Sequence, residues 1–263
     1  MSSDLRRGLE ALIGREHVSE EYVRFRIRLL EAQAAACDAV RPRAEDTPRE
    51  PTFDPTLLGR LFEELRSALP SEDLECFSVA VAAEPTLLDA LARAAACGSD
   101  EPFLTALSER LAISREALLF FGRVLRAPFV AAAVQKTGTQ HASPAQSSRL
   151  CPQCGSAPAL AKLRREDRRR ILFCSLCGEG WSFARLTCPF CGGRGCERLS
   201  APSDDVRWIE TCDECRGYIK TVDEQKLAED EVILPLVEAT SGLYLDLIAE
   251  KRGHQCPTYV ALR

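Results

Sequence analysis

Four Cys-x-x-Cys pairs constrain this chain more than any other feature of its sequence. They lie within 65 residues, at Cys151/Cys154, Cys174/Cys177, Cys188/Cys191 and Cys212/Cys215. A cysteine pair with two residues between its members can place both sulfurs on one metal ion, and two such knuckles complete a tetrahedral site of four thiolates. Eight thiols in four knuckles therefore predict two metal ions.

The spacing of the knuckles favours pairing in sequence order. The first and second knuckles are separated by 19 residues and the third and fourth by 20, a length typical of two-knuckle ribbons. The other pairings leave 10 or 33 residues between partners, and they break an internal repeat of 37–38 residues. We therefore expect one metal on Cys151, Cys154, Cys174 and Cys177, and the other on Cys188, Cys191, Cys212 and Cys215.

The residue that follows each knuckle affects the backbone conformation of the turn. Gly155, Gly178 and Gly192 directly follow the second cysteine, where a positive φ is easiest for glycine. The fourth knuckle has Arg216 before Gly217, so we expect its turn to be shifted by one residue.

Four thiolates form a closed shell that suits zinc or a single, rubredoxin-type iron ion, and the sequence does not choose between these metals. Because such a shell leaves no open position, we predict no catalytic residue and no further cofactor-binding residue. Histidine is scarce, and none of the three lies in a knuckle.

The other cysteines have plainer interpretations. Cys37, Cys76 and Cys97 lie in alanine-rich helical stretches and are expected in the core. Cys196 is interpreted as a loop cysteine, with a spare ligand or a reactive thiol as the alternatives. His254 and Cys256, taken alone, resemble a pair of metal ligands, but we do not expect them to bind a metal.

Composition and termini favour a soluble, cytoplasmic protein. The first seven residues (MSSDLRR) run into a charged amphipathic stretch with no apolar h-region, and the longest uncharged apolar runs are about eight residues, against roughly 20 for a membrane span. In a reducing compartment, paired cysteines are metal ligands more often than disulfides. Residues 150–222 carry 12 basic and 9 acidic side chains, too small an excess to favour nucleic-acid binding.

The pattern along the chain predicts an α+β fold: an N-terminal helical bundle, two tandem rubredoxin-like or zinc-ribbon tetracysteine modules, and a C-terminal helix. Ser19 and Ser114 are expected to cap helices, and one helix is expected over 229–251 with Pro235 in its first turn. Runs rich in β-branched and aromatic residues predict strands at 171–173, 181–183, 206–209 and 218–221. The expected parts are a helical domain (1–138), a linker (139–149), a first metal module (150–186), a second metal module (187–222), and a C-terminal helix with a tail (223–263).

The cysteine block resembles the formate dehydrogenase accessory protein FdhE family. The resemblance is carried by residues 151–158 (CPQCGSAP), 173–181 (FCSLCGEGW), 188–192 (CPFCG), 212–215 (CDEC) and 218–221 (YIKT), with weaker similarity at 22–33 and 127–135. It implies a cytoplasmic assembly factor, or chaperone, that binds the catalytic subunit of a respiratory formate dehydrogenase before export. It also implies iron at the tetracysteine sites.

Three functions can be considered for a chain with these features. The first is a non-enzymatic maturation factor that docks on a client subunit, since the sequence shows no nucleophile–base pattern and no phosphate loop. The second is a nucleic-acid-binding zinc-ribbon protein, and the third is a rubredoxin-like electron-transfer protein. An arginine cluster over residues 164–170 is either a solvated hairpin tip or a docking surface for an acidic partner or nucleic acid.

Overall fold

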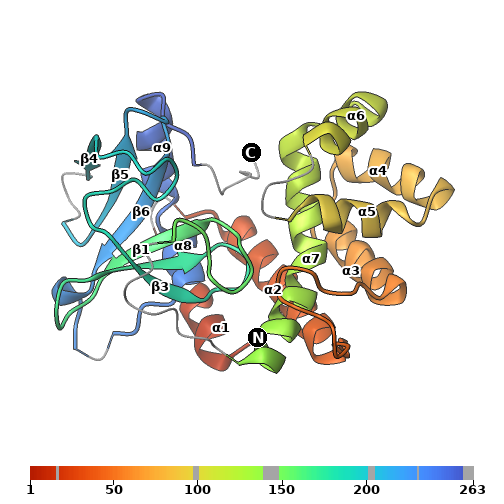
Figure 1. The fold of residues 1–263 in the computed structure, drawn as a ribbon, viewed down its shortest axis with the longest axis horizontal. Helices are drawn as coiled ribbons and strands as arrows, with labels where there is room; N and C mark the ends of the chain where they lie inside the picture. The colour runs from red at the N-terminus through yellow and green to blue at the C-terminus, as the bar shows by residue number, and fades with distance from the viewer. Residues whose placement is uncertain (16–17, 97–100, 139–147, 201–204, 230, 257–263) are drawn as a thin grey trace.

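A helical region and a β-sheet lie next to each other in this protein (Figure 1). The structure is a computed structural model that describes residues 1–15, 18–96, 101–138, 148–200, 205–229 and 231–256. The helices come first in the chain, the sheet follows, and two further helices close it. This is the α+β architecture that the sequence predicts.

The N-terminal region contains seven of the described helices. They are α1 (Ser3–Glu10), α2 (Glu20–Ala39), α3 (Pro55–Ala68), α4 (Glu72–Ala83), α5 (Leu87–Ala94), α6 (Glu101–Leu111) and α7 (Arg115–Thr137). As predicted, the Ser19 and Ser114 side chains accept hydrogen bonds from backbone amides in the first turns of α2 and α7. Apolar faces of α2 to α7 meet in one core, where Phe77 lies between Phe62 and Phe121 with ring centroids 5.5 and 5.9 Å apart.

Helix α7 runs through the centre of this region and also reaches the sheet. Its length and composition match those of a membrane-spanning helix, although no uncharged run within it is that long. Because 67% of its most apolar stretch is buried inside the protein, its hydropathy is that of a core helix. Val130 and Val134, in its last turns, pack against the first tetracysteine cluster.

The sheet has six strands. They are β1 (Pro158–Leu163), β2 (Arg170–Cys174), β3 (Gly180–Phe183), β4 (Cys196–Leu199), β5 (Arg207–Cys212) and β6 (Tyr218–Asp223), and their spatial order is β3-β2-β1-β6-β5-β4. The four strands that the sequence predicts are β2, β3, β5 and β6. Strands β1 and β4 were not expected.

The internal repeat appears in the sheet as two copies of one antiparallel unit of three strands. Strands β1, β2 and β3 form the first copy, and β4, β5 and β6 form the second in the same spatial order. A parallel pairing of β1 with β6, from Leu160–Lys220 to Leu163–Asp223, joins the copies. The two metal modules therefore share one continuous sheet.

The C-terminal segment packs on both the helices and the sheet. After the short 3-10 helix η1 (Glu224–Lys226), the helix expected over 229–251 is two helices, α8 (Pro235–Ser241) and α9 (Leu243–Lys251), separated at Gly242. Helix α8 lies against α1 and β1, and α9 lies against β5. The division of the chain into five parts stays a prediction, and most of the expected linker lies outside the described residues.

Candidate metal centres

The eight knuckle cysteines form two groups of four. Within each group all the sulfurs lie within 4.8 Å of one another. One group joins the first and second knuckles and the other joins the third and fourth, which is the pairing that the spacing predicts. The described cysteines form no disulfide bond.

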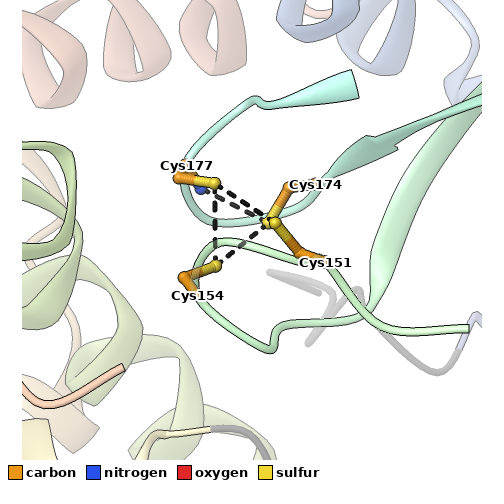
Figure 2. A group of neighbouring side chains, drawn as sticks. All are labelled: Cys151, Cys154, Cys174 and Cys177. Carbon is orange, nitrogen blue, oxygen red and sulfur yellow. Dashed lines mark hydrogen bonds between the residues drawn. The ribbon is translucent and has the colours of Figure 1, made fainter. Parts of the chain in front are cut away.

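The first cluster has the geometry of a tetrahedral thiolate site. Figure 2 shows its four sulfurs pointing toward a common centre. Cys154 Sγ lies 3.4 Å from Cys174 Sγ and 3.6 Å from Cys177 Sγ, and Cys151 Sγ lies 3.6 Å from Cys177 Sγ. Sulfurs at about 2.3 Å from a tetrahedral metal stand about 3.8 Å apart, so zinc or a single iron ion fits this cluster after a small expansion.

The second cluster has similar dimensions. Cys188 Sγ lies 3.7 Å from Cys215 Sγ, and Cys191 Sγ lies 3.6 Å from Cys212 Sγ. The donor set is again four sulfurs, which suits the same metals.

All four knuckles are built in the same way. In each of them the amide of the first cysteine donates a hydrogen bond of 2.7–2.8 Å to the carbonyl oxygen five residues later. The residue after the second cysteine takes a positive φ, and it is Gly155, Gly178, Gly192 or Arg216. These turns aim backbone amides at sulfur: the amides of Leu176 and Phe190 lie 3.4 Å from the first cysteine of their knuckles. Such contacts stabilise negative charge on a thiolate ligand.

The expected shift of the fourth turn is wrong. Arg216 has φ = 58° and occupies the position that glycine holds in the other three knuckles. Its guanidinium donates to the carbonyl oxygens of Arg252, at 2.7 Å, and Gly253, at 3.2 Å. A tertiary contact with the C-terminal segment therefore accompanies a backbone conformation that is unfavourable for arginine.

The thiols of the first cluster shift one another's pKa values. Hydrogen bonds with Cys151, and then with Cys174, lower the pKa of Cys154 far below the ordinary thiol value. Hydrogen bonds with Cys151 and Cys154 raise the pKa values of Cys174 and Cys177. The cluster thus favours a thiolate at Cys154, and binding of a divalent cation releases the protons of the other ligands.

Helix α7 covers the first cluster. Val130 and Val134 belong to the same buried apolar group as Cys151, Cys154 and Cys174. One turn earlier, the Arg126 side chain is only 3% exposed, and the charge of Cys154 acts to raise its pKa, although burial lowers the pKa overall. Residues of the helical region, which the cysteine spacing does not reveal, therefore form part of the first centre's surroundings.

The remaining cysteines lie outside both clusters. Cys37 packs against the helical core, as expected, but Cys76 is exposed on α4, so its expected core position is wrong. Cys97 lies outside the described residues. Cys196 begins strand β4 rather than lying in a loop, and burial, followed by the charges of nearby cluster sulfurs, raises the pKa of its thiol to about 12. It is therefore a protonated thiol at neutral pH.

His254 and Cys256 do not join a group of metal-ligating side chains among the described residues. The His254 side chain is buried beside the fourth knuckle, with Nε2 3.9 Å from Asp213 Oδ1. Gln255 forms a parallel bridge with Gly217. This part of the C-terminal segment covers one side of the second module.

Three of the five clustered arginines make tertiary contacts, while Arg164 and Arg169 are partly solvated and pair locally with Asp167. Arg165 donates to the carbonyl oxygens of Leu227 and Ala228, and Arg168 pairs with Asp223 at the end of β6. Arg170 is 1% exposed and forms an ion pair of 2.8 Å with Glu210 on β5. These contacts hold the β1–β2 hairpin against the second module.

The comparisons with known proteins agree with this arrangement. Residues 150–185 match the sequence model of the family "FdhE, central domain". A "Protein FdhE homolog" of Aquifex aeolicus is 34% identical over 110 residues, which are 39% of this chain and 38% of that protein. One of Shewanella oneidensis is 40% identical over 114 residues, which are 41% of this chain and 36% of that protein. The alignments thus span less than two fifths of these curated relatives.

A solved structure shares the fold over nearly the full length. The crystal structure of the FdhE protein from Pseudomonas aeruginosa superposes with a TM-score of 0.64 at 22% identity, covering 100% of this chain and 96% of that one. Together these findings confirm the resemblance to the FdhE family that the cysteine motifs indicate.

Proposed function

We propose that this chain is a metal-binding accessory protein of formate dehydrogenase maturation. It resembles the FdhE family in its cysteine motifs and shares the fold of a solved FdhE protein. In this role it binds the catalytic subunit of a formate dehydrogenase in the cytoplasm before export, as the family resemblance implies. The observation that carries the proposal is the pair of tetracysteine clusters within one sheet, flanked by helices.

A role without catalysis fits the donor sets. With Cys151, Cys154, Cys174 and Cys177 on one metal and Cys188, Cys191, Cys212 and Cys215 on the other, each tetrahedral shell is filled by protein sulfurs. Neither shell then keeps a position for substrate or water. The metals would supply folding free energy to the ribbons and leave the surface free for a protein partner.

Both zinc and iron suit these shells, and iron is the metal that the resemblance implies. Elemental analysis with an optical spectrum, on protein purified without oxygen and without added metal, identifies the native metal. Two irons per chain with ferric–thiolate absorbance would support the resemblance in full. A reversible change of that absorbance on reduction, in a chain that does not retain the catalytic subunit, would favour the electron-transfer alternative.

Nucleic-acid binding is not favoured. The arginines most suited to a phosphate-binding surface, at residues 164–170, are engaged by carboxylates and carbonyl oxygens of the same chain. The second module also presents Glu197, Asp213 and Glu214 as exposed side chains.

The proposal is tested by co-purification of a tagged chain with the catalytic subunit of formate dehydrogenase. We expect the subunit to be retained after nuclease treatment, both by the unaltered chain and by Cys76→Ser, which changes an exposed thiol outside the clusters. Cys174→Ser, which removes a proposed ligand, should retain less of it. Loss of all binding after nuclease treatment, together with a steep salt-dependent shift of DNA or RNA, would refute the proposal.

A further inference from the structure

The two tetracysteine clusters differ in how exposed their cysteine residues are. In the first, Cys151, Cys154 and Cys174 are buried and Cys177 is half-buried. In the second, Cys191 and Cys215 are exposed, while Cys188 and Cys212 are buried. In both knuckles of the second module the second cysteine is the exposed one, whereas the corresponding Cys154 and Cys177 of the first module are buried and half-buried.

The cause of this difference is the covering of each cluster. Val130 and Val134 of helix α7 pack on the first cluster, and Arg123 of the same helix donates a hydrogen bond to Ser175 inside the second knuckle. No cysteine of the second cluster belongs to a described apolar group with a helix of the N-terminal region, although Phe190 of the third knuckle packs against the group that contains Val130 and Val134. The third knuckle is followed by Gly192 and Gly193, which have no side chain to shield Cys191.

Each exposed cysteine has its sulfur beside that of a buried one. Cys191 Sγ is 3.6 Å from Cys212 Sγ, and Cys215 Sγ is 3.7 Å from Cys188 Sγ. Thiolates that solvent reaches are the ones that oxidants attack, and a neighbouring thiol then resolves the first product into a disulfide. The second cluster therefore contains two pairs, each with an accessible thiol and a resolving thiol.

We propose that the second cluster is an oxidant-sensitive metal-release site, whereas the first retains its metal. The thiolate of Cys191 or Cys215 attacks an oxygen of hydrogen peroxide, so that an S–O bond forms, the O–O bond breaks, and a sulfenic acid and hydroxide result. The neighbouring thiolate attacks that sulfur, a disulfide forms, and a second hydroxide leaves. Two electrons pass from the two sulfurs to the peroxide, and the metal departs because it has lost two ligands.

This inference relies on the proposed function only in that both clusters hold a metal. It assigns a property to one cluster that the accessory role does not require. The consequence is a protein whose second module responds to oxidants while the first stays joined to the helical region.

The experiment uses the full chain loaded with zinc, since zinc is not redox-active and the electrons must come from the thiolates. Hydrogen peroxide is added, released zinc is followed with a chromogenic chelator, and thiols are trapped with iodoacetamide and located by peptide mass spectrometry. We expect one of two zinc equivalents to leave at least about tenfold faster than the other, because cysteine oxidation follows exposure. Thiol loss should map to Cys188, Cys191, Cys212 and Cys215.

Two variants serve as controls for thiols outside the clusters. Cys76→Ser removes an exposed thiol on α4, and Cys196→Ser removes the thiol beside the second cluster. The fast release should be unchanged in both, and its loss in Cys196→Ser would overturn the assignment to the cluster sulfurs. Equal release of both equivalents, or earlier thiol loss in the first cluster, would overturn the inference and leave the proposed function intact. Loading of fewer than two zinc ions would instead overturn the metal sites themselves.

Discussion

Replacement of Arg170 by methionine should destabilise the sheet strongly. Arg170 lies on β2 of the first module and is 1% exposed, and its Nη2 is 2.8 Å from Oε2 of Glu210 on β5 of the second module. Its Nη1 also lies 3.0 Å from the carbonyl oxygen of Thr187 and 3.4 Å from that of Ala184, in the segment that connects the modules. One guanidinium thus holds a strand, a connector and the neighbouring module together.

The expected loss of stability follows from the carboxylate that the variant leaves without its partner. Removing one member of a buried ion pair costs about 3–5 kcal/mol, because the remaining charge is buried without its partner. In Arg170→Met, the Glu210 carboxylate keeps a hydrogen bond of 3.1 Å from the Thr221 hydroxyl, which offsets part of that cost. We therefore expect a loss of about 4 kcal/mol in the free energy of unfolding. The double variant Arg170→Met/Glu210→Gln should recover about 2 kcal/mol of it, since the unpaired carboxylate is gone.

Tryptophan fluorescence during urea unfolding reports on the unfolding of the sheet. The chain has two tryptophans, and both are buried in the sheet: Trp181 on β3 and Trp208 on β5. The matched control is Arg169→Met, because that side chain is 58% exposed and pairs at the surface with Asp167, and surface ion pairs contribute little to stability. A loss below about 1 kcal/mol in Arg170→Met, or a double variant that loses the sum of the single effects, would refute the reasoning.

Three further predictions concern other parts of the molecule. Gly122→Ala should destabilise the helical region by about 1–3 kcal/mol in urea unfolding followed by circular dichroism, because a Cβ there would meet the carbonyl oxygen of Leu91 in α5 at 2.7 Å. Gly59→Ala lies in α3 with open space around it, so it should stabilise the protein by about 0.5–1 kcal/mol. Effects of the same sign in the two variants would contradict this reasoning. Cys174→Ser should lose one metal per chain and melt at a lower temperature, so unchanged stoichiometry and melting would argue against the ligand assignment. Burial acts to raise the pKa of Asp46, but hydrogen bonds, first from the Thr52 hydroxyl, bring it below its ordinary value of 3.8. The ionised carboxylate therefore stabilises the fold above that value, and this stabilisation is lost as pH falls through the lower folded-state pKa. Asp46→Asn should reduce the loss of stability at acid pH when unfolding is measured from pH 7 to pH 2.

The cysteine spacing predicts the metal centres because the knuckle is a local structure. Two cysteines, two intervening residues and a turn suffice to place a pair of sulfurs, and the repeat then indicates which pairs meet. The same locality explains why the capping serines of α2 and α7 are predicted correctly. Arg216 was misread because its positive φ depends on contacts with residues 252–253, which are distant in sequence.

Two strands and one helix break were missed for related reasons. Strand β1 contains two alanines, a proline and a lysine but no β-branched or aromatic residue, and β4 is a short, largely exposed edge strand, so neither has the composition of a typical strand. The C-terminal helix breaks at Gly242, where the buried Lys220 of β6 donates to the carbonyl oxygen of Ala239 and pairs with Asp246. A lysine read from sequence alone is expected at the surface, so this contact between sheet and helices has no local signal.

The shared sheet changes what two tandem metal modules mean physically. An isolated ribbon folds with its own metal, and loss of that metal unfolds it alone. Here the parallel β1–β6 pairing and the Arg170–Glu210 ion pair cross the boundary between the repeats. The first repeat is in turn joined to the helical region through α7, and the second to the C-terminal helices through Lys220. A metal in the first cluster would therefore stabilise the part of the sheet that α7 covers, and a metal in the second would stabilise the turns next to β5 and β6. The proposed loss of the second metal would leave the contact between α7 and the first cluster in place.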